Sequence, residues 1–136
     1  MGYLTQFSCS VKGKLENKEK IAELEKAKAE AEKLTGKLRE IAMAGIEKEM
    51  KIEKSIDVET VVSKVVGYNP FEDETKWYYH EVHMRKISLQ YPDVIFELKG
   101  EGEESGDIWV KYFVNGKMQV CNATIVFEPF DEKKLK

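Results

Sequence analysis

Residues 108–127 have the sequence IWVKYFVNGKMQVCNATIVF, and this stretch decides the fold class. Apolar residues alternate along it on both sides of Asn115-Gly116, a dipeptide typical of two-residue β-hairpin turns because both turn positions need positive φ. We expect strands over 108–114 and 120–127. The residues expected to face the core from the first of these strands are Ile108, Val110, Tyr112 and Val114.

The flanking sequence predicts further strands and two short helices. Alternation of apolar and polar residues predicts strands over 3–12, 76–80 and 94–99. Apolar residues at helical spacing predict helices over 58–66 and 81–91. We therefore predict an α+β fold in a single domain, residues 1–136. It would be a two-layer sandwich with a mostly antiparallel sheet of about five strands and helices on one face.

Residues 17–56 interrupt this pattern as an inserted helical arm. They contain neither proline nor aromatic residues and are rich in strong helix formers. Apolar residues recur at spacings of three and four, as in the seam of a coiled coil. The predicted self-association seam consists of Leu24, Ala27, Ala31, Leu34, Leu38 and Ile41. We expect this arm to form a homodimer or to dock on a partner.

Two glycines leave an alternative open for the arm. Gly36 and Gly45 each cost about 1 kcal/mol relative to alanine inside a helix. A turn at Thr35-Gly36 would divide the arm into a helical hairpin that packs on its own domain.

Composition excludes several classes of protein. The 136 residues hold 22 Lys and Arg against 25 Asp and Glu, a net charge of −3. This balance disfavours nucleic acid as a partner. The sequence has no apolar run of the ~18 residues that cross a bilayer, and its first residues lack the features of a signal peptide. We expect a cytoplasmic protein without a membrane partner, with Cys9 and Cys121 as reduced thiols.

An acidic loop between two predicted strands is the first candidate for partner binding. It holds three glycines and four carboxylates, those of Glu101, Glu103, Glu104 and Asp107. Such a loop suits a basic protein surface or a hard cation. The simpler alternative is a solvated hairpin loop.

The aromatic residues provide a second candidate. Trp77 and Trp109 could lie on an exposed sheet face that stacks nucleotides or single-stranded nucleic acid, or they could pack in the core. His80 and His83 miss the metalloprotease spacing by one residue. No catalytic constellation is identifiable, so we expect a non-enzymatic protein without metal or cofactor.

Three motifs occur in a characteristic order: Lys76-Trp77-Tyr78-Tyr79-His80-Glu81, Tyr91-Pro92-Asp93-Val94 and Gly100-Glu101-Gly102-Glu103-Glu104. In this order the chain resembles a group of small proteins of phages and mobile elements in Gram-positive bacteria. More loosely, it is similar to ferredoxin-like domains of the YubB type. The resemblance covers about residues 1–13 and 60–136, so the arm lies outside it. It implies a phage or mobile-element origin and a non-enzymatic role.

These observations together predict a binding protein that engages a protein of the host cell, in whose cytoplasm it would act if phage-encoded. It could, for example, inhibit a defence enzyme or a nucleic-acid enzyme through the acidic and aromatic surface and the arm. The alternative is a module that binds nucleotides or single-stranded nucleic acid.

Overall fold

The computed structural model describes residues 2–136 and has an α+β fold with one open, four-stranded antiparallel sheet. Its strands lie in the order of the chain: β1 (Thr5–Lys12), β2 (Ile95–Gly102), β3 (Ile108–Val114) and β4 (Lys117–Asn122). All four α-helices lie between β1 and β2: α1 (Lys18–Ala31), α2 (Gly36–Lys54), α3 (Val58–Val66) and α4 (His80–Gln90). A short 3₁₀ helix, Glu132–Lys134, follows the sheet.

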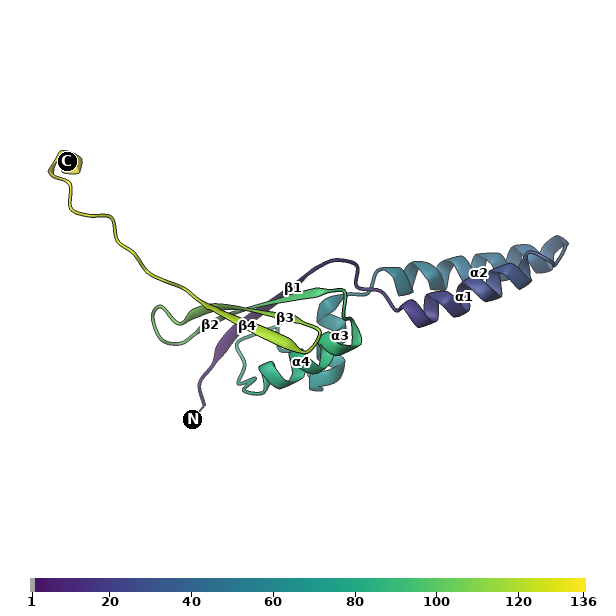
Figure 1. Ribbon diagram of the computed structural model, residues 1–136, viewed down its shortest axis with the longest axis horizontal. Helices are drawn as coiled ribbons and strands as arrows, with labels where there is room; N and C mark the ends of the chain where they lie inside the picture. The colour runs from purple at the N-terminus through teal and green to yellow at the C-terminus, as the bar shows by residue number, and fades with distance from the viewer. Residues whose placement is uncertain (1) are drawn as a thin grey trace.

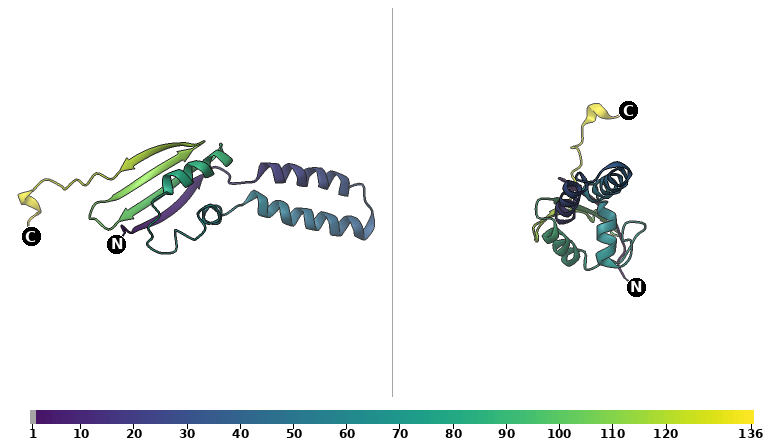
Figure 2. Two further views of the ribbon diagram at one scale, coloured as in Figure 1. Left: turned by 90° about the horizontal axis from the view of Figure 1, so that it is seen from below. Right: turned by 90° about the vertical axis from the view of Figure 1, so that its right-hand side faces the viewer.

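The core lies between one face of the sheet and the helices α3 and α4 (Figure 2). On β2, Phe96 and Leu98 are fully buried, and their cross-strand neighbours face the same helices. The helices contribute Val62 from α3, and Met84 and Ile87 from α4, to this cluster. We call this unit, without α1 and α2, the body.

The predicted core-facing residues of β3 are wrong. Phe113 pairs with the buried Phe96, which places Trp109, Lys111 and Phe113 toward the helices. The predicted set, Ile108, Val110, Tyr112 and Val114, therefore lies on the open face. Both alternating sets are apolar except for Lys111, so the sequence favoured the set without a charge.

Two predicted strands are also corrected. Residues 76–80 do not form a strand, since pairing there is limited to a single bridge between Thr5 and Thr75. The last strand ends at Asn122 because its neighbour β3 begins at Ile108 and offers no further partner. The order of elements also differs from the β-α-β-β-α-β order of ferredoxin-like domains.

The arm is a hairpin of α1 and α2, and it projects away from the body (Figure 1). Gly36 begins α2 with a φ of +62°, which suits glycine at this turn. The alternative that the arm folds as a hairpin is thus confirmed, but its packing against the body is not. Apart from their contacts with each other, α1 and α2 have no Cα atom within 8 Å of a helix or strand of the described chain.

The hairpin divides the predicted seam. Leu24 and Ala31 are buried, whereas Leu38 and Ile41 are about two-thirds exposed on the other helix, at 69% and 68%. Ala27 and Leu34 are also exposed. The six residues therefore do not form one continuous seam.

Two adjacent chain segments, one before α1 and one after α2, join the arm to the body, and we call them the neck. The backbone N–H of Asn17 donates to the carbonyl of Glu53 at 3.0 Å, and that of Ile56 donates to the carbonyl of Leu15 at 3.1 Å. The Leu15 side chain is buried in the core of the body, and Ile56 packs against that core. The two ends of the arm are thus adjacent and fixed to each other.

Candidate binding surfaces

The first candidate surface is an apolar stripe on α2, formed by Leu38, Ile41, Gly45 and Ile52. Their spacings of three, four and seven residues place them on one side of the helix. The line of Ile46 and Met50, which is more buried, lies on a different side. Ile52 is 60% exposed, so the stripe continues toward the neck. The described chain therefore leaves most of the apolar surface of this row uncovered.

The second candidate region is a network around Trp77, and it lies inside the body. Trp77 is 2% exposed, and its indole N–H donates to Nδ1 of His83 at 2.8 Å. The Trp109 ring, half-buried on the helix face of the sheet, stacks on His80 with 5.1 Å between ring centroids. Of the two alternatives for the tryptophans, Trp77 therefore follows packing in the core, and Trp109 lies half-buried on the helix side of the sheet instead of on its open face.

The contacts of Lys111 in this network explain why its side chain faces the helices. Its Nζ atom lies 2.7 Å from Nε2 of His80, 4.2 Å from the Trp109 ring centroid and 3.6 Å from a Glu81 carboxylate oxygen. Nδ1 of His80 faces the Trp77 carbonyl oxygen at 2.8 Å, and a carbonyl can only accept. We infer that His80 is neutral, with its proton on Nδ1 and Nε2 accepting from the Lys111 ammonium. The network therefore holds α4 against β3.

Acidification is expected to destabilise the fold through His80. Burial lowers the pKa of His80 below its ordinary value of 6.5, and the adjacent Lys111 ammonium lowers it further. Since the unfolded chain then binds this proton more readily than the folded chain, the full stability is present above pH 6.5 and decreases as the pH falls below it. Urea midpoints at about pH 7.5 and about pH 5.5 measure the effect.

The variant His80→Gln supplies the control for this prediction, because its side chain stays neutral at both pH values. We expect a smaller difference between its two midpoints than between those of the wild type. An equal difference in both proteins would assign the pH dependence to other groups.

The third candidate is the acidic loop between β2 and β3. Its carboxylates differ in role: the Tyr3 hydroxyl donates to Asp107 at 2.6 Å and accepts from the backbone N–H of Glu104 at 3.0 Å. Asp107 therefore fixes the loop, whereas Glu101, Glu103 and Glu104 are exposed. Within residues 2–136, no group of three or more His, Cys, Asp or Glu side chains could hold a metal ion.

The structure separates the acidic loop from the arm. Lys12 pairs with Ile95 at the end of the sheet next to the neck, and Thr5 pairs with Gly102 at the loop end. The seven residue steps along β2 from Ile95 to Gly102 span about 23 Å. The two surfaces therefore lie at opposite ends of the body, and a small partner cannot contact both.

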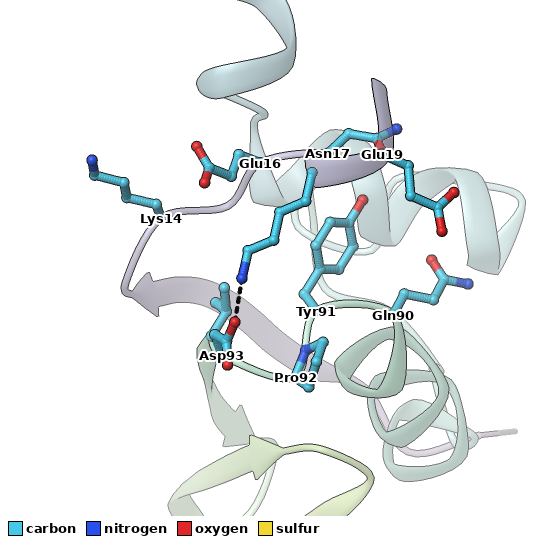
Figure 3. A pocket seen from close by; sticks show the side chains of 10 residues that line it. Lys14, Glu16, Asn17, Glu19, Gln90, Tyr91, Pro92 and Asp93 are labelled. Carbon is cyan, nitrogen blue, oxygen red and sulfur yellow. Dashed lines mark hydrogen bonds and ion pairs between the residues drawn. The ribbon is translucent and has the colours of Figure 1, made fainter. Parts of the chain in front are cut away.

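The neck carries two cavities that the sequence did not predict. Their volumes are about 440 and 450 Å³, and both are lined by Asn17, Gln90 and Tyr91. Figure 3 shows Asn17 on the arm side of the first cavity, and Tyr91 and Asp93 on the body side. Lys18 and Asp93 form an ion pair across it, and Asn17 caps α1. These side chains fasten the arm, and they are not arranged as a nucleophile with a base.

None of the helices in residues 2–136 combines the length and apolar character needed to cross a lipid bilayer. Comparisons with protein-family models, curated proteins and solved structures find no match for the chain. The function is therefore inferred from the geometry of these surfaces.

Proposed function

We propose that the protein is a binding module without catalytic activity, and that its helical arm docks on another protein. The observation that carries this proposal is an arm that contacts no other helix or strand and exposes Leu38, Ile41 and Ile52. The arm adds little to the core of the body, so its apolar stripe is not explained by the fold. A helix face of this kind fits an apolar groove or a pair of helices on a partner.

The resemblance to phage and mobile-element proteins supports a bacterial protein as the partner. A non-catalytic role is supported by the two histidines, both of which are hydrogen-bonded within the Trp77 network. The self-association predicted for the arm stays a prediction, and the α2 stripe is the surface through which it would occur.

Capture of the partner from a bacterial lysate tests the proposal through paired variants. Replacing Leu38 and Ile41 with lysine should reduce capture at least about tenfold, since each tenfold loss requires only about 1.4 kcal/mol and a buried, unpaired charge costs more. The matched control replaces Glu103 and Glu104 with lysine at the opposite end of the body. We expect the control to retain the partner.

The reverse result would contradict docking through the arm. A partner lost by the Glu103 and Glu104 variant but kept by the Leu38 and Ile41 variant would assign binding to the acidic loop. If the arm variant lowers only the molecular mass of the protein alone, the stripe is a dimer interface instead.

A further inference from the structure

The chain beyond β4 is an apolar segment that runs away from the body (Figure 1). Its largest apolar side chains are all exposed: Ile125 at 59%, Val126 at 82%, Phe127 at 86% and Phe130 at 79%. Such a concentration of exposed apolar side chains marks an interaction site. We call residues 124–130 the exit segment.

The outer edge of β4 is a second unsatisfied feature. β4 is the last strand of the sheet, so one row of its backbone N–H and C=O groups has no strand partner. On the opposite side of β4, the pairing with β3 continues for one residue beyond the strand, where the N–H of Ala123 donates to the carbonyl of Ile108 at 2.9 Å. An open edge of this kind is a template for another extended chain.

The exit segment is not placed to cover the edge from which it emerges. An antiparallel return along β4 needs a turn directly after the strand, and residues 123–131 contain no turn in the structure. The segment leaves β4 without reversing and continues beyond the sheet.

We propose that two copies of the chain exchange their exit segments, each segment adding an antiparallel strand to the β4 edge of the other copy. A two-fold axis near Ala123 produces this arrangement, because β4 and the exit segment then lie side by side in both copies. The interface is self-complementary and closed, as in most homodimers, and it covers the β4 edge of each copy. This dimer interface lies at β4, whereas the docking surface proposed for the arm lies on α2.

Side-chain chemistry agrees with this pairing. With Ala123 on the axis, Val126 lies opposite Val120 of the other copy, and Ile125 lies opposite its Cys121. The acidic residues Glu128 and Asp131 come alongside the end of β4 that carries Lys117. Two apolar positions of the segment thus face Val120 and Cys121, Phe127 lies opposite Gln119, and unlike charges meet at the end of the pair.

The expected interface is large enough for a stable dimer. Phe127 and Phe130 can each bury at most about 150–250 Å², so the two copies together supply up to about 600–1,000 Å² of aromatic surface. The remaining apolar residues and the β4 edge bring the total to the standard range of about 1,200–2,000 Å².

The oligomeric state of the full chain tests the inference. Light scattering should give twice the chain mass of 15.7 kDa for the wild type. Replacing Ile125 and Phe127 with lysine should halve that mass and leave the near-UV circular dichroism unchanged. The Leu38 and Ile41 lysine variant should remain dimeric. A monomeric wild type, or a dimer that only the arm variant breaks, would overturn the inference.

Cysteine cross-linking tests the pairing itself. Ile125→Cys should form a covalent dimer with the native Cys121 of the other copy under mild oxidation, because the two positions lie directly opposite each other. Val126→Cys is the matched control, because its side chain points to the opposite face. Within one chain, residues 121 and 125 lie about 13 Å apart along an extended strand, too far for a disulfide.

The other cysteine does not confuse the result, since burial is the main cause that raises the pKa of the Cys9 thiol to about 12. Cross-linking as strong from position 126 as from position 125 would contradict the antiparallel pairing.

Discussion

Replacing Phe96 with alanine is expected to lower the free energy of unfolding by about 3–5 kcal/mol. Phe96 has no exposed surface, pairs with Phe113 across the sheet and lies 6.3 Å from the Tyr91 ring, centroid to centroid. The substitution leaves a cavity where the sheet meets α4. The whole fold of a typical domain is stable by only about 5–15 kcal/mol.

Equilibrium urea unfolding, followed by far-UV circular dichroism, measures this loss. Leu38→Ala is the control, since its side chain is 69% exposed on the arm and should change stability by no more than about 0.5 kcal/mol. Equal losses in the two variants would show that the arm is as important to the fold as the core, which would contradict the division into arm and body.

Excision of the arm is expected to remove more than half of the helical signal and leave the body folded. The arm helices hold 14 and 19 residues, against 9 and 11 in α3 and α4. A short Gly-Ser link from Asn17 to Ser55 can replace residues 18–54, because the neck holds Asn17 and Glu53 in contact. The Lys18–Asp93 ion pair is lost, and an ion pair this exposed contributes little to stability.

Two spectra distinguish the outcomes of the excision. Far-UV circular dichroism should fall, whereas the near-UV signal of Trp77 and Trp109 should persist, since both lie in the body. The dependence of unfolding on urea should also become shallower, because less surface is exposed on unfolding. Loss of the near-UV signal would show that the arm is required for the body to fold.

Local sequence signals predicted much of this fold. The turn between β3 and β4 has φ values of 47° at Asn115 and 80° at Gly116, as the hairpin signal required. The helix predicted over 58–66 is confirmed as α3, and Gly67 ends it with a φ of 96°, a conformation that suits glycine. Each of these predictions depends on residues that are close together in the chain.

Features that depend on tertiary contacts were missed. Alternation alone cannot distinguish the two faces of β3, and only the spatial proximity of His80, Glu81 and Trp109 explains why Lys111 faces the helices. The aromatic run at 76–79 resembles a strand, yet the only backbone strand pairing beside it in the described chain is the bridge between Thr5 and Thr75. An inward lysine between two aromatic residues was the available signal for the network.

The candidate surfaces were predicted in part. The exposed carboxylates of the acidic loop lie where the sequence placed them, between two strands, whereas Trp77 is enclosed by the body. The neck cavities bring together residues near 17 and near 91, and no local pattern reports such a distant contact. Leu38 and Ile41, at the C-terminal end of the predicted seam, are exposed and belong to the stripe through which we propose that the arm docks on a partner.

Photo-cross-linking from the arm is the most direct test of the central claim that the α2 stripe contacts another protein. A photoreactive amino acid is introduced at position 38, with position 47 as the control because Glu47 is exposed on a polar side of the same helix. In bacterial cells, position 38 should yield one defined adduct with a partner, and position 47 should yield none. Equal labelling from both positions, or no adduct from position 38, would contradict the claim.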